Sequence, residues 1–330
     1  MSLADLLALI LGISLTAYAL FAGGDFGAGI LDLLAGGDAP ERAAIETAIG
    51  PVWEANHVWL IFAITILLSA FPAAFSALGT ALLAPLSVAL VAIVLRGAAV
   101  GLRASLDAGT RSHALLSCLF GAASVVAPFA FGLVAGGVAV ASRVAVAVPS
   151  IPWTGAFAIV VGGLAVCLCT QLAASFVAVR LARAGETRLL VHVRRRGLQA
   201  GAGVLVLSVA ALGVAATASP ALFRRLTGAA LPLIQLGLAA AALSLLALIV
   251  CRYRLARAAS LLTGIALVWG WLVAQSPNLI GARLTIHTAA ATAPALAAVA
   301  IACGAVLLGV LPALCLLFVM FARPRPEVIE

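Results

Sequence analysis

Repeated stretches of about 20 consecutive apolar residues constrain the fold of this chain more than any other sequence feature. An α-helix needs about that many apolar residues to cross the hydrocarbon core of a bilayer, and within lipid it satisfies its own backbone hydrogen bonds. The stretches are Leu3–Ala22, Val58–Ala77, Leu78–Leu102, Leu115–Val140, Trp153–Val179, Leu198–Ser219, Ala229–Val250, Leu255–Ala274 and Ala289–Phe321. They predict an all-α, polytopic integral membrane protein of about nine transmembrane helices.

We expect a single transmembrane domain over residues 1–330, built as two four-helix bundles and one peripheral helix. Residues 1–140 would form the first bundle, and residues 150–330 the second bundle and the last helix. The first stretch has no basic residues before it and no small-residue cleavage site after it, so we expect a retained helix that continues through Leu34. Phe71-Pro72 and nearby small residues mark the turn between the second and third stretches.

Composition excludes a soluble protein. Apolar residues make up 65% of the chain and charged residues 9%, against roughly half and a quarter in soluble domains. The net charge of +8 comes entirely from arginine, since all 19 basic residues are Arg. With no soluble basic domain to hold them, these arginines do not indicate nucleic-acid binding.

The arginines instead predict the topology. If nine helices cross the membrane, most loop arginines fall on one side, as the positive-inside rule requires for the cytoplasm. That side collects Arg42, Arg103, Arg111, Arg180, Arg183, Arg188, Arg194, Arg195, Arg196, Arg252, Arg254, Arg257, Arg323 and Arg325. The other side receives Arg143, Arg224, Arg225 and Arg283. The N-terminus is therefore expected outside and the C-terminus in the cytoplasm.

Asp25 lies in a glycine-rich part of the first predicted helix. Gly23 and Gly27 are four residues apart, so they would form a small-residue stripe that lets a neighbouring backbone approach closely. Ionisable groups within the membrane are costly, which makes Asp25 a candidate proton carrier. The alternative is a carboxylate that a neighbouring helix merely satisfies. Asp32 shares the face of Asp25 nearer the cytoplasm, and we expect it to be a solvated boundary acid.

A second polar cluster follows Gly50-Pro51, a pair expected to stop or start a helix. Trp53 and Trp59 suit an interfacial anchor. Glu54 and His57 are three residues apart and would meet on one helical face, where they could pass protons. Glu-x-x-His also resembles di-iron sites, but those need two such motifs and two further glutamates, whereas this sequence has one. The alternative is a cluster that only caps and anchors the helix.

Arg96 is the only arginine well inside a predicted helix, and it needs a counter-charge. Asp25 and Glu54 are the two candidate partners. A buried arginine beside a glycine-broken helix also suits a secondary transporter of a small anion. A purely structural membrane subunit, whose acids only pack, is a further alternative.

Several segments, in this order, resemble subunit II of cytochrome bd-type quinol oxidases. They are Gly23–Gly29, Ile49–Asn56, Val58–Leu60, Phe71-Pro72, Leu95–Gly97, Gln275–Ile280 and Leu284–Ala290. The resemblance is strong in the first 105 residues and near the C-terminus, and weak between.

The resemblance implies a nine-helix subunit, with its N-terminus outside, in the inner (cytoplasmic) membrane of a bacterium. It implies a partner, the haem-bearing subunit I, that holds two haems b, one haem d and the quinol site. That complex oxidises quinol, reduces dioxygen to water and draws protons from the cytoplasm. It leaves open a quinone or lipid bound within this chain, and small accessory subunits.

Carried over by position, Asp25 and Glu54 match acids associated with the proton path of the family. Trp53, Asn56 and Arg96 match the polar lining around them. His57 departs from the pattern, because several family members have an acid there, so its role is left open between relay and packing.

No cofactor is expected on this chain. Haem iron needs specific axial side chains, and His57 is the one candidate ligand among the four histidines. His113 and His192 fall in arginine-containing loops, and His287 falls at a predicted membrane edge.

Overall fold

The computed structural model describes residues 2–36, 39–103, 105–107, 110–141, 151–281 and 283–322. Within these ranges, the side chains of residues 39, 46–55, 57, 310, 311, 314, 315 and 317–322 are not described. The helices are α1 Leu3–Ala35, α2 Ala39–Ala70, α3 Pro72–Ala81, α4 Leu83–Arg103, α5 Arg111–Ala141, α6 Ala156–Ala184, α7 Thr187–Ala218, α8 Pro220–Leu226, α9 Leu231–Ile249, α10 Tyr253–Gln275 and α11 Ala293–Ala322. Two short antiparallel strands, β1 Asn278–Ile280 and β2 Leu284–Thr285, lie between α10 and α11.

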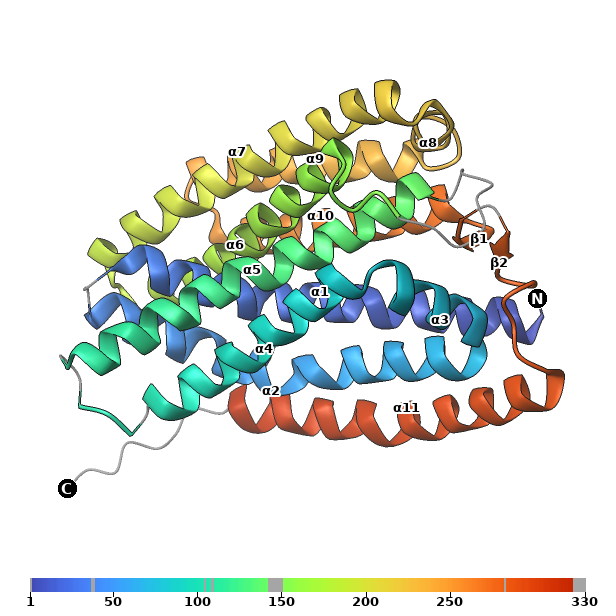
Figure 1. Ribbon diagram of the computed structural model, residues 1–330. Coiled ribbons are helices and arrows are strands. Elements are labelled where there is room, and N and C mark those ends of the chain that lie inside the picture. The colour runs from blue at the N-terminus through green and yellow to red at the C-terminus, as the bar shows by residue number, and fades with distance from the viewer. Residues whose placement is uncertain are drawn as a thin grey trace.

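Helix α1 is the central element of the fold (Figure 1). It packs against α2, α5, α6, α10 and α11, whereas α11 lies at the outside against α2 and α1. A capping box begins α1: the Ser2 hydroxyl accepts a hydrogen bond from the Asp5 amide at 3.2 Å, and the Asp5 carboxylate accepts one from the Ser2 amide at 2.9 Å. Gly36, with φ 62°, ends it. The expected continuation of the first helix through Leu34 is confirmed.

Seven helices are long and apolar enough to cross a membrane: α1, α4, α5, α6, α7, α9 and α10. An eighth crossing is reached if Val58–Ala70 and α3 count as one span, although the two are bent by 115° at their junction. The described apolar part of α11, Ala293–Gly309, is shorter. The structure therefore supports a polytopic membrane protein with seven or eight such spans in its described part, and the nine expected helices stay a prediction.

The turn expected at Phe71-Pro72 is confirmed, whereas the bounds of the second and third predicted spans were wrong. The second helix ends at Ala70 instead of Ala77, and α4 begins at Leu83 instead of Leu78. Phe71 leaves helical geometry (φ −132°, ψ 58°), and Pro72, which has no N–H to donate, opens α3 in a new direction. The apolar composition continues across the break, so hydropathy alone could not locate it.

Two further expectations were wrong. Helix α2 runs through Gly50-Pro51, which was expected to stop or start a helix. The arginine-rich segment after α6 is largely helical, because α7 begins at Thr187 and carries Arg188–Arg196 within its first turns. Apart from the short β1–β2 hairpin, the described fold is all-α, as expected.

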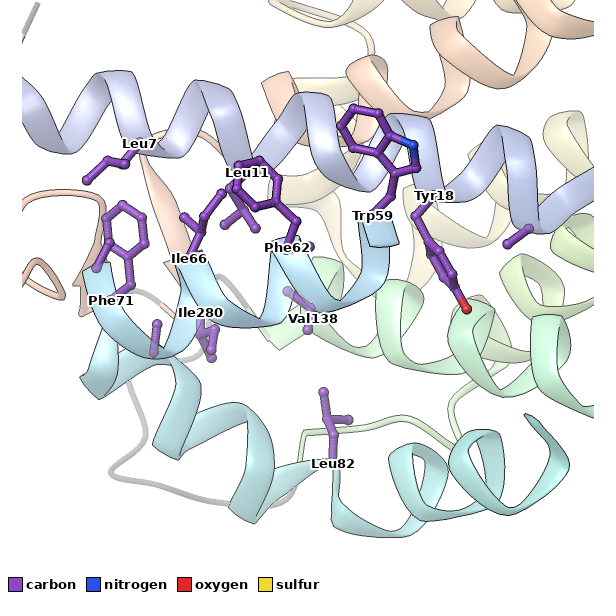
Figure 2. Packing of buried hydrophobic residues seen from close by; sticks show 14 of the residues in the cluster. Leu7, Leu11, Tyr18, Trp59, Phe62, Ile66, Phe71, Leu82, Val138 and Ile280 are labelled. Carbon is purple, nitrogen blue, oxygen red and sulfur yellow. The ribbon is translucent and has the colours of Figure 1, made fainter. Parts of the chain in front are cut away.

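The hydrophobic core beside α1 is shown in Figure 2. Trp59, Phe62, Ile66 and Phe71 come from α2 and its end, and they pack with Leu7 and other buried residues of α1. Trp59 and Phe62 make an edge-to-face contact, with ring centroids 6.5 Å apart. This packing fixes α2 against α1 and so sets the position of the polar residues on both helices.

Candidate functional site

Asp25 and Arg96 form a buried ion pair between α1 and α4. The Asp25 residue is 3% exposed and Arg96 is 4% exposed. Arg96 Nη1 donates a hydrogen bond of 2.5 Å to Asp25 Oδ2, and Nη2 donates to Oδ1 and, at 2.9 Å, to the main-chain oxygen of Asp25. A bidentate arginine–carboxylate contact of this kind fixes both position and orientation. Of the two counter-charges expected for Arg96, the structure shows Asp25; the Glu54 side chain lies outside the described part.

Two further polar side chains complete the contacts of this pair. Asn56 of α2 donates from Nδ2 to Asp25 Oδ2 at 3.2 Å, and Arg96 Nε donates to the Ser124 hydroxyl of α5 at 2.9 Å. The Ser124 hydroxyl in turn donates to the Phe120 carbonyl at 2.7 Å. The fully buried Asn56 Oδ1 has no hydrogen-bond partner among the described residues. This oxygen can therefore accept a hydrogen bond from a water molecule or from a protonated acid.

Aromatic rings enclose the Arg96 guanidinium. Its Cζ atom lies 5.1 Å from the centre of the Phe26 ring and 4.9 Å from that of Phe120. The packing around Ser124 is also tight, because a Cβ atom at Gly29 would overlap the Ser124 hydroxyl. Cation–π contacts and close packing together hold the arginine out of water.

The glycine stripe around Asp25 brings α1 close to α6, as the sequence predicted. A Cβ atom at Gly27 would overlap the main-chain carbonyl of Cys169, and one at Gly23 would lie 2.9 Å from the Leu172 side chain. Small residues therefore allow a backbone-to-backbone approach next to the buried charge. This contact fixes the position of the α1 backbone next to Asp25 relative to α6.

A second ion-paired acid lies two turns along α1 from Asp25. Asp32 is 1% exposed, with Oδ2 3.3 Å from Arg103 Nη1 and Oδ1 3.5 Å from Arg42 Nε. The expectation of a solvated boundary acid was therefore wrong. Arginines from α2 and α4 shield this carboxylate from solvent, and the amino-acid composition alone does not predict such tertiary contacts. The Arg103 Cζ atom lies 5.3 Å from the centre of the Phe120 ring, the same ring that contacts Arg96.

Glu41 is a buried acid that the sequence analysis missed. It is 1% exposed and lies in the first turn of α2. Arg196 of α7 donates to its carboxylate and, at 2.7 Å, to the Leu34 carbonyl near the end of α1. His192 Nδ1 lies 3.6 Å from Glu41 Oε2. Asp25, Asp32 and Glu41 thus form a series of arginine-paired acids leading from the middle of the bundle to one end.

The remaining predicted site residues do not join the Asp25–Arg96 cluster in the described part of the structure. Trp53, Glu54 and His57 lie on α2, but their side chains are outside the described part of the structure. Trp59 was expected at the membrane interface, and this was wrong: it is buried in the core, and its indole N–H has no hydrogen-bond partner among the described residues. Across the described residues, no group of three or more His, Cys, Asp or Glu side chains could hold a metal ion.

The chain was compared with known proteins. The sequence model of the family described as cytochrome bd terminal oxidase subunit II matches residues 3–321. The chain belongs to the cytochrome bd terminal oxidase subunit II family. This assignment makes the chain part of an oxidoreductase family, and it overturns the alternative of a secondary transporter.

The chain is also similar to one curated protein and one solved structure. The cytochrome bd ubiquinol oxidase subunit 2 of Bacillus subtilis (strain 168) is 30% identical over 106 residues. That match spans 32% of this chain and about a third, 31%, of the relative. A chain of the bd oxidase structure from Geobacillus thermodenitrificans matches with a TM-score of 0.81 at 20% identity, covering 98% of this chain and 99% of that one. This chain therefore shares its fold with that structure over nearly its whole length.

Proposed function

We propose that this chain is the haem-free subunit of a membrane-bound quinol oxidase, and that Asp25 and its neighbours form part of the path by which protons reach the oxygen-reducing centre. The partner would be a haem-bearing subunit I with two haems b and one haem d, which oxidises quinol and reduces dioxygen to water. The buried contact of Asp25 with Arg96 and Asn56, in a chain of this family, carries the proposal.

Nine crossings, with the N-terminus outside and the C-terminus in the cytoplasm, are part of this proposal. The seven apolar helices, the bent pair and α11 together would supply them. The arginine distribution supports the orientation. With it, the end of α1 near Glu41 lies at the cytoplasmic surface of a bacterial inner membrane, and Asp25 lies deeper.

The proton step follows from the hydrogen bonds at Asp25. Arg96 holds both carboxylate oxygens through hydrogen bonds, so that transfer would require no large movement. Asn56 Oδ1, which has no described partner, can accept a hydrogen bond from water or from a protonated acid. Glu54, two residues earlier on α2, would be the next carrier, with Trp53 and His57 in the lining. A proton would pass from the cytoplasmic side to Asp25, then to Glu54, and on to the partner subunit.

The test is the isosteric change Asp25→Asn in the complex purified with its partner subunit. Asparagine keeps hydrogen-bonding atoms but cannot carry a proton at this position. We expect quinol-driven oxygen consumption to fall at least tenfold while the haem absorption spectrum is unchanged, and Glu54→Gln to act in the same direction. The matched control is Asp107→Asn, at an exposed acid. Unchanged turnover in Asp25→Asn would leave the cluster with a structural role and overturn the proton path.

A further inference from the structure

A pocket lies at the end of the molecule where α6 and α9 finish and α10 begins. Its volume is about 420 Å³, and it is open to the outside. Three arginines and three apolar side chains are among its lining residues: Arg183, Arg252, Arg254, Val179, Ala182 and Leu255. No acidic residue lines this pocket in the described part of the chain. The pocket therefore combines positive charge with an apolar wall at the boundary of the membrane-spanning helices.

The ends of α6 and α9 do not account for these arginines. Carbonyl groups at the C-terminus of a helix often take arginine as a cap. At α9, Arg194 already donates to the carbonyls of Leu248 and Ile249, at 2.8 and 2.7 Å. At α6, the Glu186 amide donates to the Leu181 carbonyl at 3.1 Å. Arg252 caps α9 only through its main-chain amide, which donates to the Ala247 carbonyl at 2.7 Å, so the pocket guanidinium groups are not used as caps there.

The guanidinium groups of the pocket also lack ion-pair partners. Within the described residues, Arg183, Arg252 and Arg254 are exposed and make no ion pair, in contrast to Arg42, Arg96, Arg103 and Arg196, which pair with buried acids. Three like charges around one pocket repel one another, so an anion bound among them is favoured. A planar guanidinium donates two hydrogen bonds at once to a phosphate group.

We propose that this pocket binds the phosphate headgroup of an anionic phospholipid from the adjacent membrane leaflet. The arginines belong to the side of the chain that carries most of its loop arginines, where anionic headgroups attract basic residues. The apolar wall of Val179, Ala182 and Leu255 contacts the glycerol and the first acyl carbons, which a free phosphate ion lacks. Because these groups are remote in sequence from Asp25 and Arg96, the inference does not depend on the proton path.

The test uses the delipidated complex of this chain with its partner subunit. Phosphatidylglycerol is added back, and bound lipid is counted by native mass spectrometry together with the midpoint of thermal unfolding. The variant is Arg252→Gln/Arg254→Gln. The matched control is Arg111→Gln/Arg195→Gln, which removes the same charge from two exposed arginines outside the pocket. Arg183→Gln is the second variant, should the double change impair assembly.

We expect phosphatidylglycerol to remain bound to the original complex and to the control, and its affinity to fall about tenfold in the pocket variant. Phosphatidylcholine should bind weakly to all three proteins. Equal retention of phosphatidylglycerol by pocket variant and control would overturn the site. Full displacement of the lipid by millimolar inorganic phosphate would show a free-anion site and overturn the assignment to lipid.

Discussion

Arg96 donates hydrogen bonds to both carboxylate oxygens of Asp25 and, at 2.9 Å, to the main-chain oxygen of the same residue. The arginine therefore fixes the side chain and the backbone of α1 at one point. Both charges are out of water, so removing either one leaves the other buried without its counter-charge.

The first prediction separates the stability of this ion pair from its function. Asp25→Ala leaves the Arg96 charge buried and unpaired, which should lower the free energy of unfolding by about 3–5 kcal/mol. Adding Arg96→Met removes that charge and fills the space between Phe26 and Phe120, so most of the loss should be recovered. Turnover should stay low in both variants. Thermal unfolding of the purified complex measures the first effect, and oxygen consumption the second. If the double variant were no more stable than the single one, the ion pair would not be the source of the loss.

The second prediction concerns the contact between α1 and α6. Gly27→Ala would place a methyl group on the Cys169 carbonyl, so the two helices must move apart. Overpacking of this kind costs about 1–3 kcal/mol or more. We expect a lower yield of assembled complex and a lower unfolding midpoint. Gly213→Ala is the control, since nothing lies within 4 Å of its Cβ position, and it should be neutral or slightly stabilising. Equal behaviour of the two variants would show that α1 can shift without cost.

The sequence predicted those parts of the fold and site that follow from lipid as a solvent. Long apolar stretches had to be helices, and an arginine inside one of them had to have an acid nearby, which is why Asp25 was one of two acids expected to pair with Arg96. The glycines at positions 23 and 27 indicated a close approach by their spacing alone.

What could not be predicted depends on tertiary contacts. The Glu41 side chain is buried by Arg196, which is 155 residues away and lies in a segment that composition assigned to a loop. Asp32 is buried because arginines from two other helices converge on it. Phe71-Pro72 marked the turn after the second helix, but not its angle of 115°. The spacing of apolar residues along the sequence does not indicate any of these tertiary features.

The third prediction tests Asp32, which joins α1 to α2 and α4 through Arg42 and Arg103. Asp32→Asn keeps the size of the side chain but removes its charge, so both arginines lose their ion pair. Arg42 is partly exposed and can turn toward water, which limits the loss to about 1–3 kcal/mol. The unfolding midpoint of the complex should fall, while Asp107→Asn should leave it unchanged. A variant as stable as the original would show that the two arginines find other partners without cost.

The fourth prediction tests whether Glu41 ties the end of α7 to α1 and α2. Its carboxylate pairs with Arg196, which also holds the Leu34 carbonyl, so one arginine links three helices. In Glu41→Gln the arginine keeps its bond to Leu34 but loses the charge opposite it, and His192 loses its neighbouring carboxylate. We expect faster hydrogen–deuterium exchange at the first turns of α2 and α7, with the centre of α1 unaffected. Glu186→Gln, at an exposed position at the start of α7, is the control and should not change exchange. Unaltered exchange in Glu41→Gln would mean that apolar packing alone holds these helix ends together.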